Sequence, residues 1–242
     1  MFNNPYFWDE LAQSWSGGRQ QTFAIYREHI WRIMTQGTRD TIYMVSFSSL
    51  FAIILGLLIG LLLYVSQKDG IYPMLIFNRT LGFIVNIGRS IPFVVLIMLV
   101  FPLSRIITGR SIGPTAAIVP LTIAAIPFMS RIVEAAINDL GHGIIEAAQA
   151  TGATPLQIIF RVLLPEAAPG LVLGFTLLII NLLTFSAMAG LVGGGGLGQV
   201  AQSDGVQRHR QDVVIYVVII MVALVQIVQV TGQFIARRLD KR

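Results

Sequence analysis

Long apolar stretches dominate the sequence, and their lengths fit helices that cross a lipid bilayer. Such a helix needs about 20 mostly apolar residues. Stretches of this kind lie at residues 44–65, 80–103, 112–130, 169–190 and 213–236. Arg89 interrupts the second stretch, and Pro92, Pro120 and Pro127 lie inside apolar runs, where a proline bends a helix. The pattern predicts an all-α, polytopic membrane protein with five transmembrane helices and with its termini on opposite sides.

The first 40 residues are more polar than the stretch that follows them. Between residues 23 and 34, apolar side chains recur at helical spacing with charged residues between them. This pattern fits an amphipathic helix in the membrane interface and a helical lead-in to the first span equally well. We therefore separate residues 1–40, an N-terminal extension and interfacial helix, from a transmembrane domain at residues 41–242.

The composition agrees with a chain built for lipid. Hydrophobic residues make up 55% and charged residues 12% of the sequence, against about 25% charged residues in a typical soluble domain. The formal net charge of +5 would suit a nucleic-acid binder, but the sequence has no basic run with interleaved aromatic residues. We expect the basic residues to face lipid headgroups of the bilayer, and we expect no nucleic-acid partner.

The inventory of reactive side chains argues against an enzyme. The sequence has no cysteine, which excludes disulfides, thiolate nucleophiles and cysteine-based metal sites. His29, His142 and His209 lie far apart, and no P-loop sequence occurs. Residues 193–198 formally match the G-x-G-x-x-G motif of dinucleotide sites, but a membrane span precedes them where that motif needs a strand. We expect no catalytic residue, cofactor or metal, and a tight outer loop at this glycine run.

Three smaller patterns predict local contacts. Gly56 and Gly60 allow a close helix approach, which we expect within one protomer rather than at a subunit interface. Arg131 and Glu134 are spaced to form an ion pair on one helix face. Arg89 is a charge within an apolar stretch, and we expect it to lie near the membrane face and reach the headgroups.

The connection between the third and fourth spans, residues 134–169, is too long for a turn and is patterned as two short helices. The first covers residues 143–151, with small residues on one side. Gly152 follows it, and a glycine there closes a helix in the left-handed conformation at little cost.

The second short helix has a clear start. Thr154 is a predicted N-cap, Pro155 occupies the first helical position, and Gln157 completes a capping box. Pro165 is expected to end this helix. Its apolar residues at helical spacing are Leu156, Ile159, Phe160 and Leu163. From these residues alone, docking into a groove on a partner and a re-entrant cap over the chain's own bundle both remain open.

The connection also carries a sequence motif. Glu146-Ala147-Ala148, then Gly152, then Val162 and Leu164-Pro165 resemble the coupling motif of ABC importer permeases, with Val162 in place of an isoleucine. The resemblance implies that residues 138–166 form a cytoplasmic coupling loop in a groove of an ATPase subunit. It assigns ATPase coupling to Glu146, Ala147, Ala148, Gly152, Thr154, Val162, Leu164 and Pro165. Basic residues alone do not decide the orientation, whereas the resemblance implies an outer N-terminus and a cytoplasmic C-terminus.

The similarity extends over most of the chain, to the methionine-import permease family. The segments that carry it are residues 86–93, 116–136, 163–172 and 186–198. The resemblance implies a permease subunit of an ATP-driven importer in the bacterial inner membrane, which translocates methionine or a close derivative by alternating access. Its expected partners are two ATP-binding cassette ATPase subunits and an extracytoplasmic substrate-binding protein. Because five spans are few to enclose a path, we also expect a homodimer with the path at its twofold axis.

The same resemblance suggests a translocation pathway at Ser186 and Met188. The matching family segment lies along the pathway, where a methionine side chain can close a pore. A methionine in a membrane helix is otherwise a packing residue, so a gate and a packing role both remain open for Met188.

The alternatives are a permease for another amino acid or a quaternary ammonium compound, a stand-alone secondary transporter, and a membrane-embedded enzyme. An ion-coupled carrier usually has acids or histidines in its spans. Spans one, three, four and five have none at mid-membrane. An enzyme would need a nucleophile with a base or a metal set, and no such cluster is visible.

Overall fold

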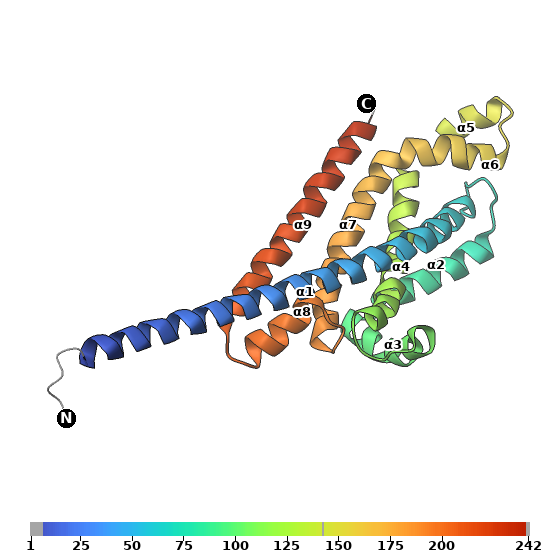
Figure 1. Ribbon diagram of the computed structural model, residues 1–242. Helices are drawn as coiled ribbons and strands as arrows, with labels where there is room; N and C mark the ends of the chain where they lie inside the picture. The colour runs from blue at the N-terminus through green and yellow to red at the C-terminus, as the bar shows by residue number, and fades with distance from the viewer. Residues whose placement is uncertain (1–6, 142, 241–242) are drawn as a thin grey trace.

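The computed structural model describes residues 7–141 and 143–240, with side chains from residue 28 onward, and all regular structure in this part is helical. His142 and residues 1–6 of the N-terminal extension lie outside it. The elements, shown in Figure 1, are α1 (Phe7–Val65), α2 (Leu75–Ser90), α3 (Phe93–Thr108), α4 (Pro114–Asn138), α5 (Gly143–Ala150), α6 (Pro155–Gln157), the π-helical η1 (Ile158–Leu163), α7 (Leu164–Leu191), α8 (Gly196–Val200), the π-helical η2 (Ala201–Val206) and α9 (Gln211–Leu239). The predicted all-α class is confirmed.

Four helical segments are long and apolar enough to cross a membrane. They are Glu28–Val65, Pro114–Asn138, Pro155–Val206 and Gln211–Leu239. The bent pair α2 and α3 makes a fifth if its two parts are counted as one span. The predicted number of five spans holds in that sense, although several helices extend well beyond the apolar stretches.

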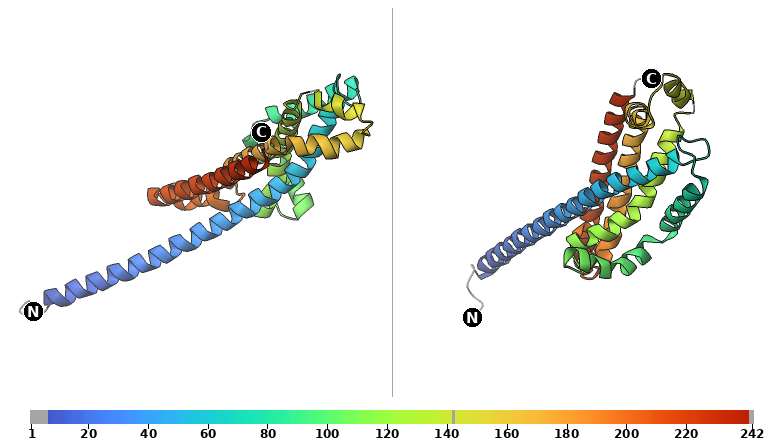
Figure 2. Two further views of the ribbon diagram at one scale, coloured as in Figure 1. Left: turned by 90° about the horizontal axis from the view of Figure 1, so that it is seen from above. Right: turned by 90° about the vertical axis from the view of Figure 1, so that its right-hand side faces the viewer.

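The N-terminal region forms one helix with the first span. α1 has 59 residues and runs through residue 40 without a break. In Figure 2 its N-terminal part projects away from the other helices, while its C-terminal part lies within the bundle. The backbone therefore has the continuous helical lead-in, not a separate helix ahead of the span.

The second predicted span is broken in the middle. α2 ends at Ser90, α3 begins at Phe93, and the two helices are bent by 105°. Ile91 is extended, with ψ of 122°. The cause is Pro92, which lacks an N–H group and pushes the residue before it out of helical conformation. The prediction of one helix over residues 80–103 was wrong here, whereas Pro120 and Pro127 remain inside α4.

α4 lies at the centre of the bundle and packs against α1, α3 and α7. Met129 and Val133 of α4 are fully buried. A Cβ atom at Gly56 would lie 2.5 Å from Met129 Cβ, and one at Gly60 would lie 2.6 Å from Val133 Cβ. The two glycines therefore let side chains of α4 pack directly against the backbone of α1. The prediction that they pack within one protomer is confirmed.

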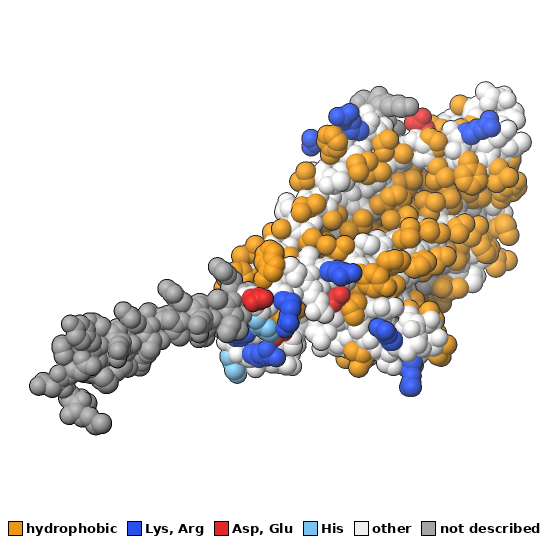
Figure 3. Space-filling model, viewed as in Figure 1, with side chains coloured by type: hydrophobic (Ala, Val, Ile, Leu, Met, Phe, Trp, Pro, Cys, Tyr) orange, Lys and Arg blue, Asp and Glu red, His pale blue; other side chains and the backbone are white. Residues whose placement is uncertain are grey.

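The outer surface of the bundle is apolar. Figure 3 shows hydrophobic side chains over the middle of the molecule and most charged side chains toward its two ends. The exposed large side chains include Leu58, Leu99 and Ile227, at 55%, 71% and 62% exposure. This distribution suits a helical bundle whose outer surface is in contact with lipid.

Candidate functional site

The first candidate site is the coupling element, residues 138–166, which lies at the same end of the molecule as the C-terminus (Figure 1). In α5, Glu146 and Ala147 are exposed. Ile145 is buried, and Ala148 is half-buried and packs against the main hydrophobic core. The outward surface of α5 is therefore carried by Glu146 and Ala147, while Ala148 helps to seat the helix on the bundle.

Gly152 ends α5 in the predicted way. Its φ is +77°. The Gly152 N–H donates to Gln149 O at 2.9 Å and the Ala153 N–H donates to Ala148 O at 3.2 Å, which together form a Schellman motif. A Cβ atom at Gly152 would meet nothing within 4 Å. The residue is therefore required for its left-handed backbone and not for lack of space.

The start of the second short helix is also confirmed. Thr154 is extended, with ψ of 154°, and Pro155 follows in the first turn. The backbone N–H of Thr154 donates to Gln157 Oε1 at 2.9 Å. This contact is half of the predicted capping box and sets the direction in which the chain leaves the turn at Gly152.

The prediction that Pro165 ends this helix was wrong. The chain passes from α6 through η1 into α7 without interruption, and Pro165 lies in the first turn of α7. In η1 the backbone bonds reach five residues back, as from Leu164 N to Ile159 O. This wider turn gives the proline ring room where an α-helix would clash. The second coupling helix therefore runs on into the fourth span without a loop, and the chain turns where the two meet (Figure 1).

The apolar residues of this segment do not all face inward. Ile158 and Leu163 are buried, whereas Leu156 and Phe160 are 67% and 63% exposed. Val162 and Leu164 are half-buried. The coupling element therefore presents outward apolar side chains as well as Ala147, at the end of the molecule that also carries the C-terminal arginines.

The second candidate site is at the far end of α7. Met188 is 37% exposed there. Ser186 is buried, and its hydroxyl donates to Leu183 O at 2.7 Å. Of the two predicted pathway residues, only Met188 therefore offers its side chain to the exterior of the protomer, and Ser186 supports the helix behind it.

The glycine run after α7 forms a tight reversal that brings α8 back against α7. Gly193, Gly195 and Gly196 have φ of +88°, +84° and +73°. A Cβ atom at Gly190 would lie 2.6 Å from the Gly198 carbonyl carbon. The segment is buried and faces α1, where the Leu197 N–H donates to Thr41 Oγ1 at 2.9 Å. The run is a packing device, and no strand precedes it in the described chain.

The predicted Arg131–Glu134 ion pair is present at 2.7 Å. Sequence reasoning missed its further partners. Arg131 Nη2 donates to Gly82 O at 3.0 Å and to Asn86 Oδ1 at 2.9 Å, and Gln67 Nε2 donates to Glu134 Oε1 at 3.0 Å. The network joins α4 to α2 and to the end of α1, at the start of the segment that leads into the coupling element.

Arg89 does not lie where the sequence suggested. It projects from the last turn of α2 beside a cavity that is lined by Ala124 and Phe128 of α4 and by Leu178 and Asn181 of α7. These residues belong to the central parts of α4 and α7. Arg89 therefore lies midway along the length of the bundle, with its side chain exposed on the protomer, since the break at Pro92 ends α2 halfway along its neighbours. Two features of the sequence indicate this cavity: Pro92, and Asn181, which is the single asparagine in the apolar run of α7.

Comparison with known proteins identifies relatives over nearly the whole chain. Residues 52–242 match the family described as the binding-protein-dependent transport system inner membrane component. The probable D-methionine transport system permease protein MetI of Vibrio cholerae is 46% identical over 210 residues, which are 87% of this chain and 93% of that protein. The D-methionine transport system permease protein MetI of Escherichia coli K12 is 47% identical over 158 residues, 65% of this chain and 73% of that protein.

Solved structures share the fold. A chain of the MetNI methionine ABC transporter, in inward-facing conformations, matches with a TM-score of 0.87 and 43% identity over 88% of this chain and 99% of that chain. A chain of an amino acid ABC transporter with histidines matches with a TM-score of 0.72 at 19% identity, over 88% and 97% of the two chains, which supports the fold alone. The chain thus belongs to the family of binding-protein-dependent transport system inner membrane components, and within it to the methionine-import permeases.

Proposed function

We propose that this chain is the membrane-spanning permease subunit of an ATP-driven importer, and that it translocates methionine or a close derivative by alternating access. The observation that carries the proposal is the match to D-methionine permeases over 87% of the chain, together with the fold of a methionine ABC transporter. The chain does no chemistry itself. ATP hydrolysis takes place in a separate subunit, and a substrate-binding protein delivers the cargo from outside.

The coupling element is the proposed docking surface for the ATPase. Glu146 and Ala147 form the outward face of α5, and Leu156 and Phe160 form outward apolar side chains of the segment that follows. Gly152 and Thr154 fix the angle between the two helices, and Val162, Leu164 and Pro165 join them to α7. This assignment gives a cytoplasmic C-terminus and an outer N-terminus, since the coupling element and the C-terminus lie at the same end of the molecule (Figure 1).

The continuous helix from α6 to α7 explains how motion in the ATPase reaches the pathway. Residues 155–191 form one helical run, which at about 1.5 Å per residue is about 55 Å long when followed along its axis. Because no loop absorbs motion along it, a displacement of the coupling helix moves Met188 at the far end. The Arg131–Glu134 network adds a second rigid connection at the cytoplasmic end.

Met188 is the proposed gate, at the twofold axis of a homodimer. Its exposed side chain lies near the end of α7 opposite the coupling element. Two copies that face each other close a path with flexible, polarizable side chains, and separation of the two α7 helices opens it. Ser186 lies behind Met188 and holds the helix through its bond to Leu183 O.

The test of cargo is growth of a methionine auxotroph that lacks its own methionine uptake. The strain should grow on limiting methionine when it carries genes for this chain, its ATPase and its binding protein. The matched control strain carries the same genes, but with the Ala147→Glu variant of this chain, which adds bulk and charge to the docking face. No rescue by the wild-type genes, together with uptake of another amino acid or a quaternary ammonium compound, would identify a different cargo.

A further inference from the structure

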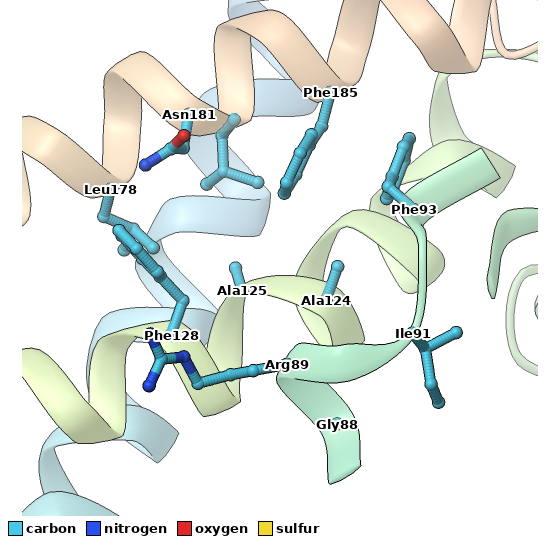
Figure 4. A pocket seen from close by; sticks show the side chains of 11 residues that line it. Gly88, Arg89, Ile91, Phe93, Ala124, Ala125, Phe128, Leu178, Asn181 and Phe185 are labelled. Atoms are coloured by element: carbon cyan, nitrogen blue, oxygen red, sulfur yellow. The ribbon is translucent and has the colours of Figure 1, made fainter. Parts of the chain in front are cut away.

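The break between α2 and α3 lies beside a partly open cavity of about 230 Å³. The residues that line it come from α2, the break, α3, α4 and α7. Figure 4 shows Arg89 extending from the end of α2 and Asn181 and Phe185 projecting from α7. Phe128 of α4 lies between Arg89 and α7, and Phe93 of α3 lies beside Phe185. The cavity is smaller than the about 300–1,000 Å³ of pockets for drug-sized ligands, so it suits a molecule of amino-acid size.

Arg89 has no anionic partner in the described part of the chain. Its guanidinium takes part in no hydrogen bond or ion pair there. The nearest acid along α4, Glu134, is already bonded to Arg131 and to Gln67. The central part of α7 contains no acid. Arg89 is exposed on the protomer and lies midway along α4 and α7. A charge that faces a bilayer at this depth is costly, so an anionic partner from outside the protomer would stabilise it.

The remaining walls match the other parts of an apolar amino acid. Phe93 and Phe185 stack with ring centroids 4.6 Å apart, and Phe128 and Leu178 add further apolar surface. Aromatic edges make favourable contacts with a thioether sulfur. The Asn181 amide forms no hydrogen bond in the described chain and is half-exposed to the cavity. Its oxygen is an acceptor for an ammonium group.

We propose that this cavity is a transit site for the transported amino acid, in which Arg89 binds the substrate carboxylate, Asn181 accepts from the ammonium group and the phenylalanines hold the apolar side chain. The inference rests on the proposed function, and it adds that the membrane subunit itself selects for a free carboxylate. Arg89 suits this task because its guanidinium offers two parallel donors to a carboxylate and stays charged.

The test measures equilibrium binding to the purified complex of this chain with its ATPase, in lipid nanodiscs. The probes are labelled methionine and labelled methioninol, which lacks the carboxylate. Arg89→Ala should weaken methionine binding about ten- to hundred-fold and leave methioninol binding unchanged. Arg89→Lys should have an intermediate affinity. Asn181→Leu should weaken both ligands, because both carry the ammonium group. Arg105→Ala, at the exposed end of α3 and outside the cavity, is the matched control.

Two results would overturn the transit site. One is wild-type methionine affinity in Arg89→Ala, or in Arg89→Gln if the alanine variant does not assemble. The other is an equal loss of methionine and methioninol. A lipid headgroup phosphate is a second possible anion for Arg89, and binding is therefore measured in nanodiscs of neutral and of anionic lipid. If the methionine affinity of the wild-type complex falls several-fold in anionic lipid, the headgroup phosphate is the partner of Arg89 and the proposal is contradicted. Methionine uptake by the wild-type complex tests the proposed function independently of all these results.

Discussion

At the scale of single residues, two glycines are required for different physical reasons. Gly152 adopts a left-handed backbone in open space, whereas Gly60 has ordinary helical geometry but no room for a side chain. The sequence predicted both positions because each lies in a local pattern, a helix end and a small-xxx-small pair. The contact partners of Gly60 on α4 depend on tertiary packing, and the sequence did not reveal them.

Gly152→Val should weaken binding of the ATPase without unfolding the spans. A β-branched residue in left-handed conformation costs about 1–2 kcal/mol, and relief of this strain changes the angle between the coupling helices. The matched control is Gly152→Asn, since asparagine tolerates this conformation. The measurement is the amount of ATPase that co-purifies with each variant. Equal recovery with valine and with asparagine would remove the left-handed turn from the coupling mechanism.

Gly60→Val should destabilise the protomer itself. The new side chain would overlap Val133 and Ser130 of α4, and overpacking of this kind costs about 1–3 kcal/mol. Gly143→Ala is the control, because a Cβ atom there meets nothing within 4 Å and the backbone is not left-handed. Thermal unfolding in detergent should show a lower midpoint for Gly60→Val only. An unchanged midpoint would mean that α1 and α4 do not touch as described.

At the scale of elements, the sequence predicted helix ends that depend on neighbouring residues, but it did not predict whether a helix continues past a proline. The ends at Gly152 and Thr154 depend on a few neighbouring residues, and both were predicted. Pro165 was predicted to end a helix, but η1 accommodates it, because packing of Ile158 and Leu163 on the core holds the chain helical. Pro92 follows the extended Ile91 and breaks its span, and the depth of Arg89 follows from that 105° bend.

Deletion of Ala168 should uncouple ATP hydrolysis from transport. Removal of one residue from the α-helical start of α7 turns the coupling helices by about 100° relative to the rest of α7, because an α-helix has 3.6 residues per turn. The docking face then no longer meets the same groove. Val162→Ile keeps the register and is the control, with transport within a factor of two of wild type. Normal transport by the deletion variant would argue against a rigid connection between the coupling element and α7.

At the scale of the whole molecule, the apolar exterior and Met188 near one end of α7 predict the geometry of the dimer. The sequence has no cysteine, so a single introduced cysteine reports on one contact. Met188→Cys should form a disulfide between two protomers under mild oxidation, since a gate at the twofold axis brings the two copies within the about 4.4–6.8 Å between Cα atoms that a disulfide needs. Ile227→Cys, on exposed α9, should not. Cross-linking of Ile227→Cys alone would place the interface on α9.

The most direct test of the account is uptake of labelled methionine into vesicles that contain the full complex of this chain, its ATPase and its binding protein. Uptake should require ATP on the cytoplasmic side and the binding protein on the other side. It should fall to background when Gly152→Val replaces the wild-type chain, and the chain alone should hydrolyse no ATP. Methionine uptake that is independent of ATP, or ATP hydrolysis by the purified chain, would contradict the account.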